Sequence, residues 1–188
     1  MERRRIEMAK KKIFVVGLIL LVLIIGGGAY FVGRSAKKKI SLEDLQQEGE
    51  YQYLQLEWGI SVDDAKRKFK IPMETDPSRI PAPDTYEFYK TKERFLLDGQ
   101  TADASLEFKD YRLEALQFCF EIDENAEEWF KKQIGQLQEL VGAESEAFEN
   151  GEGPFRSRSY KWETEKTTLQ VVLIYGTNAN VIFSLGSK

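Results

Sequence analysis

The longest hydrophobic pattern in the sequence is an unbroken apolar run from Ile13 to Val32, without a single charge. A helix rises about 1.5 Å per residue, so a run of this length spans about 30 Å, the thickness of the hydrocarbon core of a bilayer. The run therefore predicts one transmembrane helix. Arg34 and Lys37–Lys39 crowd its C-terminal end, which favours an uncleaved signal anchor over a cleaved signal peptide.

After residue 57 the pattern changes to short elements that each have one apolar face. Helical spacing predicts one helix that begins at the cap Ser61 and ends before Pro72, and a second between the cap Asn125 and Gly142. Alternation of apolar and polar residues predicts seven strands, at 86–90, 94–98, 102–109, 113–122, 160–165, 167–175 and 179–185. Residues 143–158 show neither spacing and are predicted to form a long loop.

The order helix, strands, helix, strands predicts an α+β fold with two αβββ-type repeats, in which an antiparallel sheet carries the helices on one face. The fold is preceded by one transmembrane helix. The predicted organisation is a basic tail, the transmembrane helix, a juxtamembrane connector, repeat one and repeat two, at 1–12, 13–32, 33–57, 58–122 and 123–188. The α+β domain as a whole is thus expected at 58–188.

The helix entries and hairpins of both halves resemble a known repeat type. The segments that carry this resemblance are Trp58-Gly59-Ile60-Ser61, Val62–Lys66, Tyr86–Phe88, Leu106–Leu113, Trp129–Gly142 and Thr167–Leu169. They look like the αβββ repeat of β-lactamase-inhibitory-protein-like domains, which is also similar to the repeat in the small lipoprotein of outer-membrane assembly complexes. The chain departs from these families because its one cysteine, Cys119, provides neither a lipid attachment site near the apolar run nor a repeat disulfide.

The charges are distributed unevenly along the 188 residues. The chain carries 27 Lys and Arg against 31 Asp and Glu. Residues 1–39 hold ten of the basic side chains and two of the acidic ones, which leaves 17 basic and 29 acidic side chains for residues 40–188. Six basic residues precede the apolar run and four follow it, so the positive-inside rule predicts a cytoplasmic N-terminus and a C-terminal domain outside the cytoplasm, in the cell envelope. The acidic domain disfavours nucleic acid as a partner.

The residue types present favour binding over catalysis. The chain has no histidine, which removes Ser-His-Asp and Cys-His arrangements and most zinc sites. Its paired carboxylates, Asp63-Asp64, Asp123-Glu124 and Glu127-Glu128, lie at predicted helix starts, where acids stabilise the helix dipole. We therefore expect no catalytic residue, no cofactor and no metal site. We also expect at least two of the three tryptophans, Trp58, Trp129 and Trp162, to be core residues, and Cys119 to be a packed small hydrophobe.

The candidate partner-binding residues are Phe155, Arg156 and Arg158, in the predicted loop 143–158. Aromatic and guanidinium side chains are enriched at protein interfaces, and loops on a rigid scaffold often carry function. The Pro-rich loop 71–85 is a second candidate. The leading hypothesis is a single-pass, membrane-anchored, non-catalytic module that contacts the bilayer through residues 13–32 and binds another protein.

Two alternative functions stay open. One is an envelope hydrolase that uses a pair of carboxylates. The other is a structural subunit of an envelope complex, in which the small residues Ala29 and Gly33 contact a partner helix.

Overall fold

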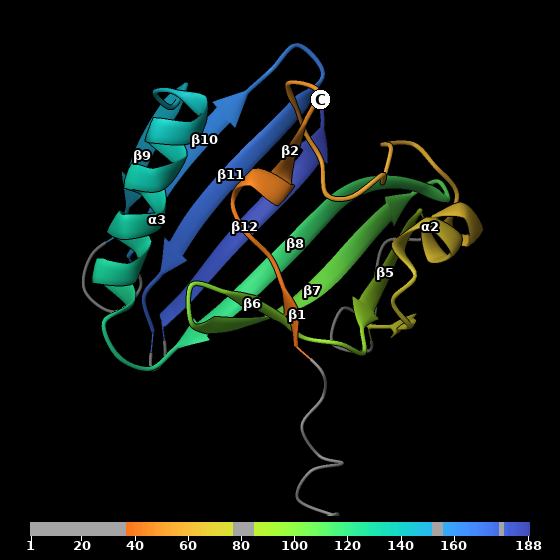
Figure 1. The fold of residues 1–188 in the computed structure, drawn as a ribbon, viewed down its shortest axis with the longest axis horizontal. Coiled ribbons are helices and arrows are strands. Elements are labelled where there is room, and N and C mark those ends of the chain that lie inside the picture. The colour runs from red at the N-terminus through yellow and green to blue at the C-terminus, as the bar shows by residue number, and fades with distance from the viewer. Residues whose placement is uncertain (1–36, 77–84, 152–155, 177–178) are drawn as a thin grey trace, which may run out of the picture. The chain divides into compact units, whose positions relative to one another are not determined.

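A ten-stranded β-sheet is the largest element of the fold (Figure 1). The computed structural model describes residues 37–76, 85–151, 156–176 and 179–188, which lie in the unit Lys37–Lys188. The main path of the sheet runs β1-β6-β7-β8-β12-β11-β10-β9, and β5 pairs with both β7 and β4. The strands are β1 Lys38–Lys39, β4 Met73–Thr75, β5 Tyr86–Thr91, β6 Phe95–Leu97, β7 Gln100–Lys109, β8 Arg112–Ile122, β9 Glu146–Asn150, β10 Ser157–Glu163, β11 Thr167–Ile174 and β12 Ala179–Ser187.

Tight turns set the register of the first half of the sheet. Asp98 and Gly99 both have positive φ, 45° and 83°, and join β6 to β7. Asp110 and Tyr111 likewise have φ of 49° and 64° and join β7 to β8. Two-residue turns of this kind match the right-handed twist of antiparallel strands. The pairings between neighbours are antiparallel, except that β1 runs parallel to β6, so the sheet is mixed.

Two helices cover the apolar face of the sheet, and Figure 1 shows both on the viewer's side. Helix α2, Val62–Phe69, begins at Ser61, whose hydroxyl accepts the Asp64 N–H at 3.2 Å, so the predicted cap is confirmed. Helix α3, Ala126–Val141, begins at Asn125 and ends at Gly142. The Asn125 side chain accepts no capping bond. The buried side of α3 includes Trp129, which packs against phenylalanines of β8 and β12.

Residues 37–57 are part of the fold, which corrects the expectation of a connector there. The segment contains β1, the 3₁₀ helix η1 Glu43–Leu45 and the small hairpin of β2 Gln46–Gln47 with β3 Glu50–Tyr51. Six of its side chains are buried: Ile40, Leu42, Leu45, Tyr51, Tyr53 and Leu56. Tyr53 makes edge contacts with the rings of Phe69, Phe95 and Phe118, with centroids 6.0, 6.0 and 5.3 Å away. The segment therefore lies over the sheet between the two helices.

The prediction of two equivalent αβββ repeats on an antiparallel sheet is wrong, although the α+β class is right. Five strands, β4 to β8, follow α2, and four strands, β9 to β12, follow α3. The sheet is mixed because β1, which precedes both proposed repeats, joins it in parallel. The physical reason is that β1, β4 and β9, which the sequence pattern did not predict, form strands because a neighbouring strand offers them backbone hydrogen bonds. Their own sequences do not carry a repeat pattern.

The predicted transmembrane helix also finds no support in the structure. Among the helices that the structure describes, none has the length and apolarity needed to cross a bilayer. The sequence-based segments 1–12 and 13–32, together with Ala29 and Gly33, lie outside the described residues.

If residues 37–57 belong to the core, truncating a buried side chain in them must destabilise the whole fold. We expect Leu45→Ala to lower the free energy of unfolding by about 2–5 kcal/mol, because Leu45 is 1% exposed and a cavity replaces it. Urea unfolding of the 188-residue chain, followed by tryptophan fluorescence, measures this change. Gln47→Ala, a substitution at a partly exposed position of the same segment, is the control. Equal stability of the two variants would contradict the assignment.

Candidate functional site

Two of the three candidate partner-binding residues, Arg156 and Arg158, lie at the start of strand β10. Residues 146–150 form β9, and β10 begins at Ser157, so the predicted loop 143–158 is wrong at 146–150 and at 157–158. Arg158 is the second residue of β10, and Arg156 directly precedes that strand. Phe155 lies outside the described residues.

Glu127, in the first turn of α3, brings the two arginines together. Its Oε1 atom lies 3.3 Å from Nη1 of Arg158 and 2.9 Å from Nζ of Lys131. Its Oε2 atom accepts the hydroxyl of Tyr175 at 3.1 Å and lies 3.6 Å from Nη2 of Arg156. We call these five residues the Glu127 cluster. The cluster connects α3 to β10 and to the end of β11.

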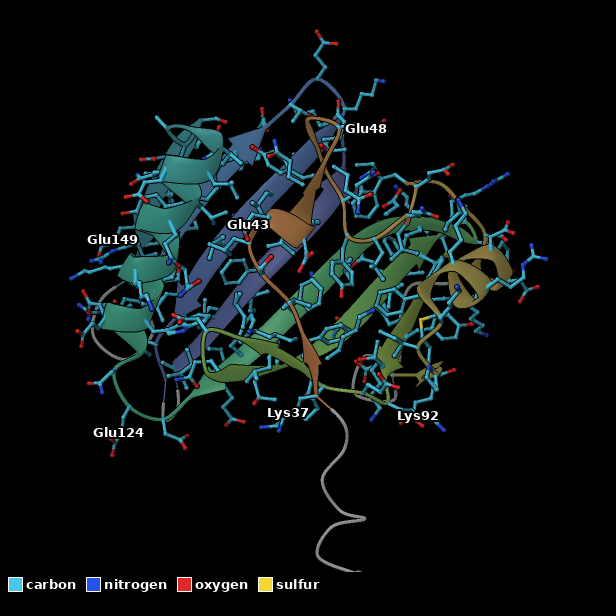
Figure 2. The ribbon with its side chains drawn as sticks, viewed as in Figure 1. Lys37, Glu43, Glu48, Lys92, Glu124 and Glu149 are labelled. Atoms are coloured by element: carbon cyan, nitrogen blue, oxygen red, sulfur yellow. The ribbon has the colours of Figure 1, made fainter. Side chains whose placement is uncertain are left out.

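The second guanidinium nitrogen of Arg158 connects the cluster to β9. It donates to Glu149 Oε1 at 3.1 Å, and the two residues are directly opposite in the β9–β10 register. The side chain of Arg158 is only 22% exposed, because carboxylates occupy both of its outer nitrogens. Figure 2 labels Glu149 at the margin of the molecule beside α3.

Arg156 stacks on an aromatic ring and is more exposed to solvent than Arg158. Its guanidinium carbon lies 3.9 Å from the centroid of the Tyr175 ring, a cation–π distance. Its carbonyl oxygen accepts the backbone N–H of Tyr175 at 3.1 Å. The side chain is 40% exposed. A guanidinium fixed on an aromatic ring in this way can receive a carboxylate from solvent.

The contacts within the Glu127 cluster shift the pKa values of its groups in the directions that preserve those contacts. Hydrogen bonds from Lys131 and Tyr175, together with the nearby cationic charges of Lys131 and Arg158, lower the pKa of Glu127 to about 2. Burial and the bond to Glu127 raise the pKa of Tyr175, so its hydroxyl is a stable donor. The bond to Glu149 raises the pKa of Arg158. Glu127, Tyr175 and Arg158 therefore keep one charge state over the whole neutral range.

The carboxylates expected to cap helices do so only in part. Asp64 accepts bonds from Ser61 and from Arg67 at the start of α2, and Glu127 belongs to the cluster above. The pKa is lowered for six of the described carboxyl groups, by hydrogen bonds to the ionised form: Glu43, Glu50, Asp64, Glu127, Glu144 and Glu163. A carboxylic acid that donates a proton near neutral pH needs a raised pKa. Among the described residues, no group of three His, Cys, Asp or Glu is placed to hold a metal ion.

Two of the three tryptophans are core residues, whereas Cys119 lies on the other face of the sheet. Trp129 and Trp162 are buried, and their indole N–H groups donate to the carbonyls of Asp98 and Gly142 at 3.3 and 3.0 Å. This confirms the core prediction for two of the three; Trp58 is partly buried. Cys119 is half-buried on the opposite face of the sheet, where its thiol donates to Asn180. It is therefore not packed in the main apolar core.

Sequence reasoning missed Gln133, on the buried side of α3. Its side chain is fully buried and its amide nitrogen donates to Asp98 Oδ2 at 2.9 Å, but its Oε1 atom has no hydrogen-bond partner in the described part of the chain. Gln133 borders a groove of about 490 Å³ between α3 and residues 39–43. A polar residue within the apolar stripe of a predicted helix was the available signal.

No protein-family model matches the sequence, and neither a curated protein nor a solved structure is significantly similar to it. The resemblance to β-lactamase-inhibitory-protein-like domains therefore stays a prediction.

The pKa of Glu127 gives a pH prediction. A folded-state pKa of about 2, below the ordinary value of 4.5, means that the ionised carboxylate stabilises the fold above about pH 4.5. This contribution falls away as the pH drops from 4.5 through 2. We expect the side-chain carboxyl ¹³C resonance of Glu127 to titrate with a midpoint near 2.

The control for this titration is Glu127→Gln, which cannot ionise at this position. Its free energy of unfolding should fall less between pH 4.5 and pH 2.5 than that of the unsubstituted chain. A Glu127 midpoint near 4.5 in the folded protein would show that the cluster does not form.

Proposed function

We propose that residues 37–188 form a non-catalytic protein-binding module, and that the surface beside the Glu127 cluster contacts the partner. The observation that supports this most directly is Arg156, whose part-exposed guanidinium is stacked on Tyr175 and held near Glu127. Phe155 is its neighbour in sequence. Arginine and aromatic side chains are the types that contribute most to binding energy at protein interfaces.

The fixed position of Arg156 adds to this support. Ordering a long side chain at an interface costs free energy, which is smaller when the free protein already holds that side chain in place. In this protein the ring of Tyr175, the Glu127 carboxylate and a backbone hydrogen bond already restrain Arg156. A partner carboxylate can therefore bind a guanidinium that loses little further freedom.

A pull-down with the double variant Phe155→Ala, Arg156→Ala tests the contact surface. We expect recovery of the partner from a detergent extract to fall about tenfold or more, since loss of two interface anchors commonly costs more than 1.4 kcal/mol. The matched control is Tyr111→Ala, Arg94→Ala, which removes an exposed aromatic ring and an exposed arginine elsewhere on the domain. Equal recovery with both double variants would exclude this surface.

In the same proposal, residues 13–32 hold the module at a lipid bilayer with the N-terminus in the cytoplasm. The support comes from the sequence: the run has no charge, and six basic residues precede it against four that follow. Basic side chains that closely follow a membrane span in sequence can reach lipid headgroups, which is compatible with the four that follow. The module would then meet its partner outside the cytoplasm, in the cell envelope.

Cysteine accessibility in intact cells tests this orientation. In a Cys119→Ser background, Asn150→Cys should react with a membrane-impermeant maleimide, because Asn150 is exposed on the domain. Lys11→Cys, on the other side of the apolar run, should react only after the cells are permeabilised. The reverse labelling pattern would place the domain in the cytoplasm.

A further inference from the structure

Strand β9 is held at one edge of the sheet by a single neighbour. It is the last strand of the main sheet path, and among the described residues its only strand partner is β10. All five of its residues, Glu146–Asn150, are exposed. In an antiparallel edge strand, alternate residues turn their N–H and C=O groups away from the neighbour. Within the described part of the chain, those outward groups of β9 have no hydrogen-bond partner.

The side chains of β9 combine one large apolar residue with negative charge. Phe148 is 63% exposed, an unusual position for a phenylalanine. Residues 143–150 hold three glutamates, Glu144, Glu146 and Glu149, and no basic residue. The nearest cations of β10 are already engaged: Arg158 binds Glu127 and Glu149, and Lys161 pairs with Glu163 at 2.5 Å. The edge is therefore acidic.

The register shows where an added strand would place its own side chains. Phe148 is opposite Ser159, which is opposite Val172, which is opposite Ile182. This row lies on the face of the sheet that α2 and α3 do not cover. A residue paired with Phe148 would extend the row, so an apolar residue suits that position. Basic residues suit the positions opposite Glu146 and Glu149.

From these observations we infer that β9 receives an extended peptide segment of a partner protein, which adds to the sheet as a further strand, with an apolar residue opposite Phe148 and basic residues opposite Glu146 and Glu149. Backbone hydrogen bonds to the free edge would supply affinity, while Phe148 and the carboxylates would select the sequence. A second copy of this chain fits poorly, because pairing β9 with itself brings two acidic strands together. The inference deepens the proposed function, on which it rests, by stating the chemistry of the partner.

Fluorescence anisotropy with a labelled eight-residue peptide of central sequence Lys-Val-Thr-Lys tests the inference, because in antiparallel pairing this order places valine opposite Phe148 and lysines opposite Glu149 and Glu146. The protein is the 188-residue chain in micelles of a non-ionic detergent. We expect saturable binding. We also expect affinity to fall about tenfold with Glu146→Lys, since a favourable cross-strand charge pair becomes a repulsive one, and to fall with Phe148→Ala. Both residues are exposed, so neither variant removes core packing.

Glu124→Lys is the matched charge control, because Glu124 is exposed and lies outside β9 (Figure 2). It should bind the peptide as tightly as the unsubstituted chain does. Two further peptides separate strand addition from simple charge attraction. The same peptide N-methylated at alternate residues cannot form the edge hydrogen bonds and should not bind, and a peptide with glutamate in place of each lysine should not bind either.

Several results would overturn the inference: no binding of the unmodified peptide, equal binding of the N-methylated peptide, or equal loss of affinity with Glu124→Lys. A dimer of the chain that Phe148→Ala abolishes, detected by light scattering, would assign the edge to a second copy. The pull-down keeps the two proposals distinguishable. If Phe148→Ala retains the cellular partner while Phe155→Ala, Arg156→Ala loses it, strand addition fails and the binding function stands.

Discussion

The fold depends on covering one apolar face of a wide sheet. Eight strands along the main path, about 4.8 Å apart, span about 34 Å. Helix α3 has sixteen residues and α2 has eight, which correspond to about 24 and 12 Å of helix. They cover the two ends of the sheet and leave the middle to another element. Residues 40–56 fill that gap, with Tyr53 meeting Phe69, Phe95 and Phe118 over the central strands.

Because residues 40–56 must cover the middle of the sheet, hydrogen bonds hold this segment to the sheet. The backbone N–H of Tyr51 donates to the buried hydroxyl of Thr167 at 2.8 Å, and Glu50 accepts bonds from Thr167 and Thr164. These bonds join β3 to the start of β11, which is distant in sequence. The two ends of the described unit are thereby locked together over a shared core.

Sequence patterns predicted the elements whose own residues determine them. Helix α3 and strands β7, β8 and β11 have strong periodicity, and the structure has them close to the expected bounds. The strands β1, β4 and β9 were not predicted, because their sequences carry little pattern of their own. Residues 40–56 are buried by the shape of the sheet above which they lie, and β9 is a strand because β10 offers it a partner.

In the candidate site too, the sequence predicted some of the residues and only the fold shows the others. Arg156 and Arg158 could be identified from residue type and position, but their partner Glu127 could not, since it reads as an ordinary acid in the first turn of a helix. Glu127 is near the arginines only because α3 crosses the sheet at β10 and the end of β11. Likewise Gln133 reads as a minor defect in an apolar stripe, and only the fold shows that its oxygen is buried without a described partner.

The Glu127 cluster and the exposed edge of β9 are physically coupled. Arg158 binds Glu127 on the helix with one nitrogen and Glu149 on β9 with the other, so it ties the edge strand to α3. A five-residue strand with exposed side chains would otherwise be anchored by β10 alone. The same bonds neutralise Arg158, and Glu163 pairs with Lys161, so the cations of β10 nearest to the edge are already occupied by carboxylates. The cluster thus both fixes the geometry of the edge and sets the charge that a partner strand would meet.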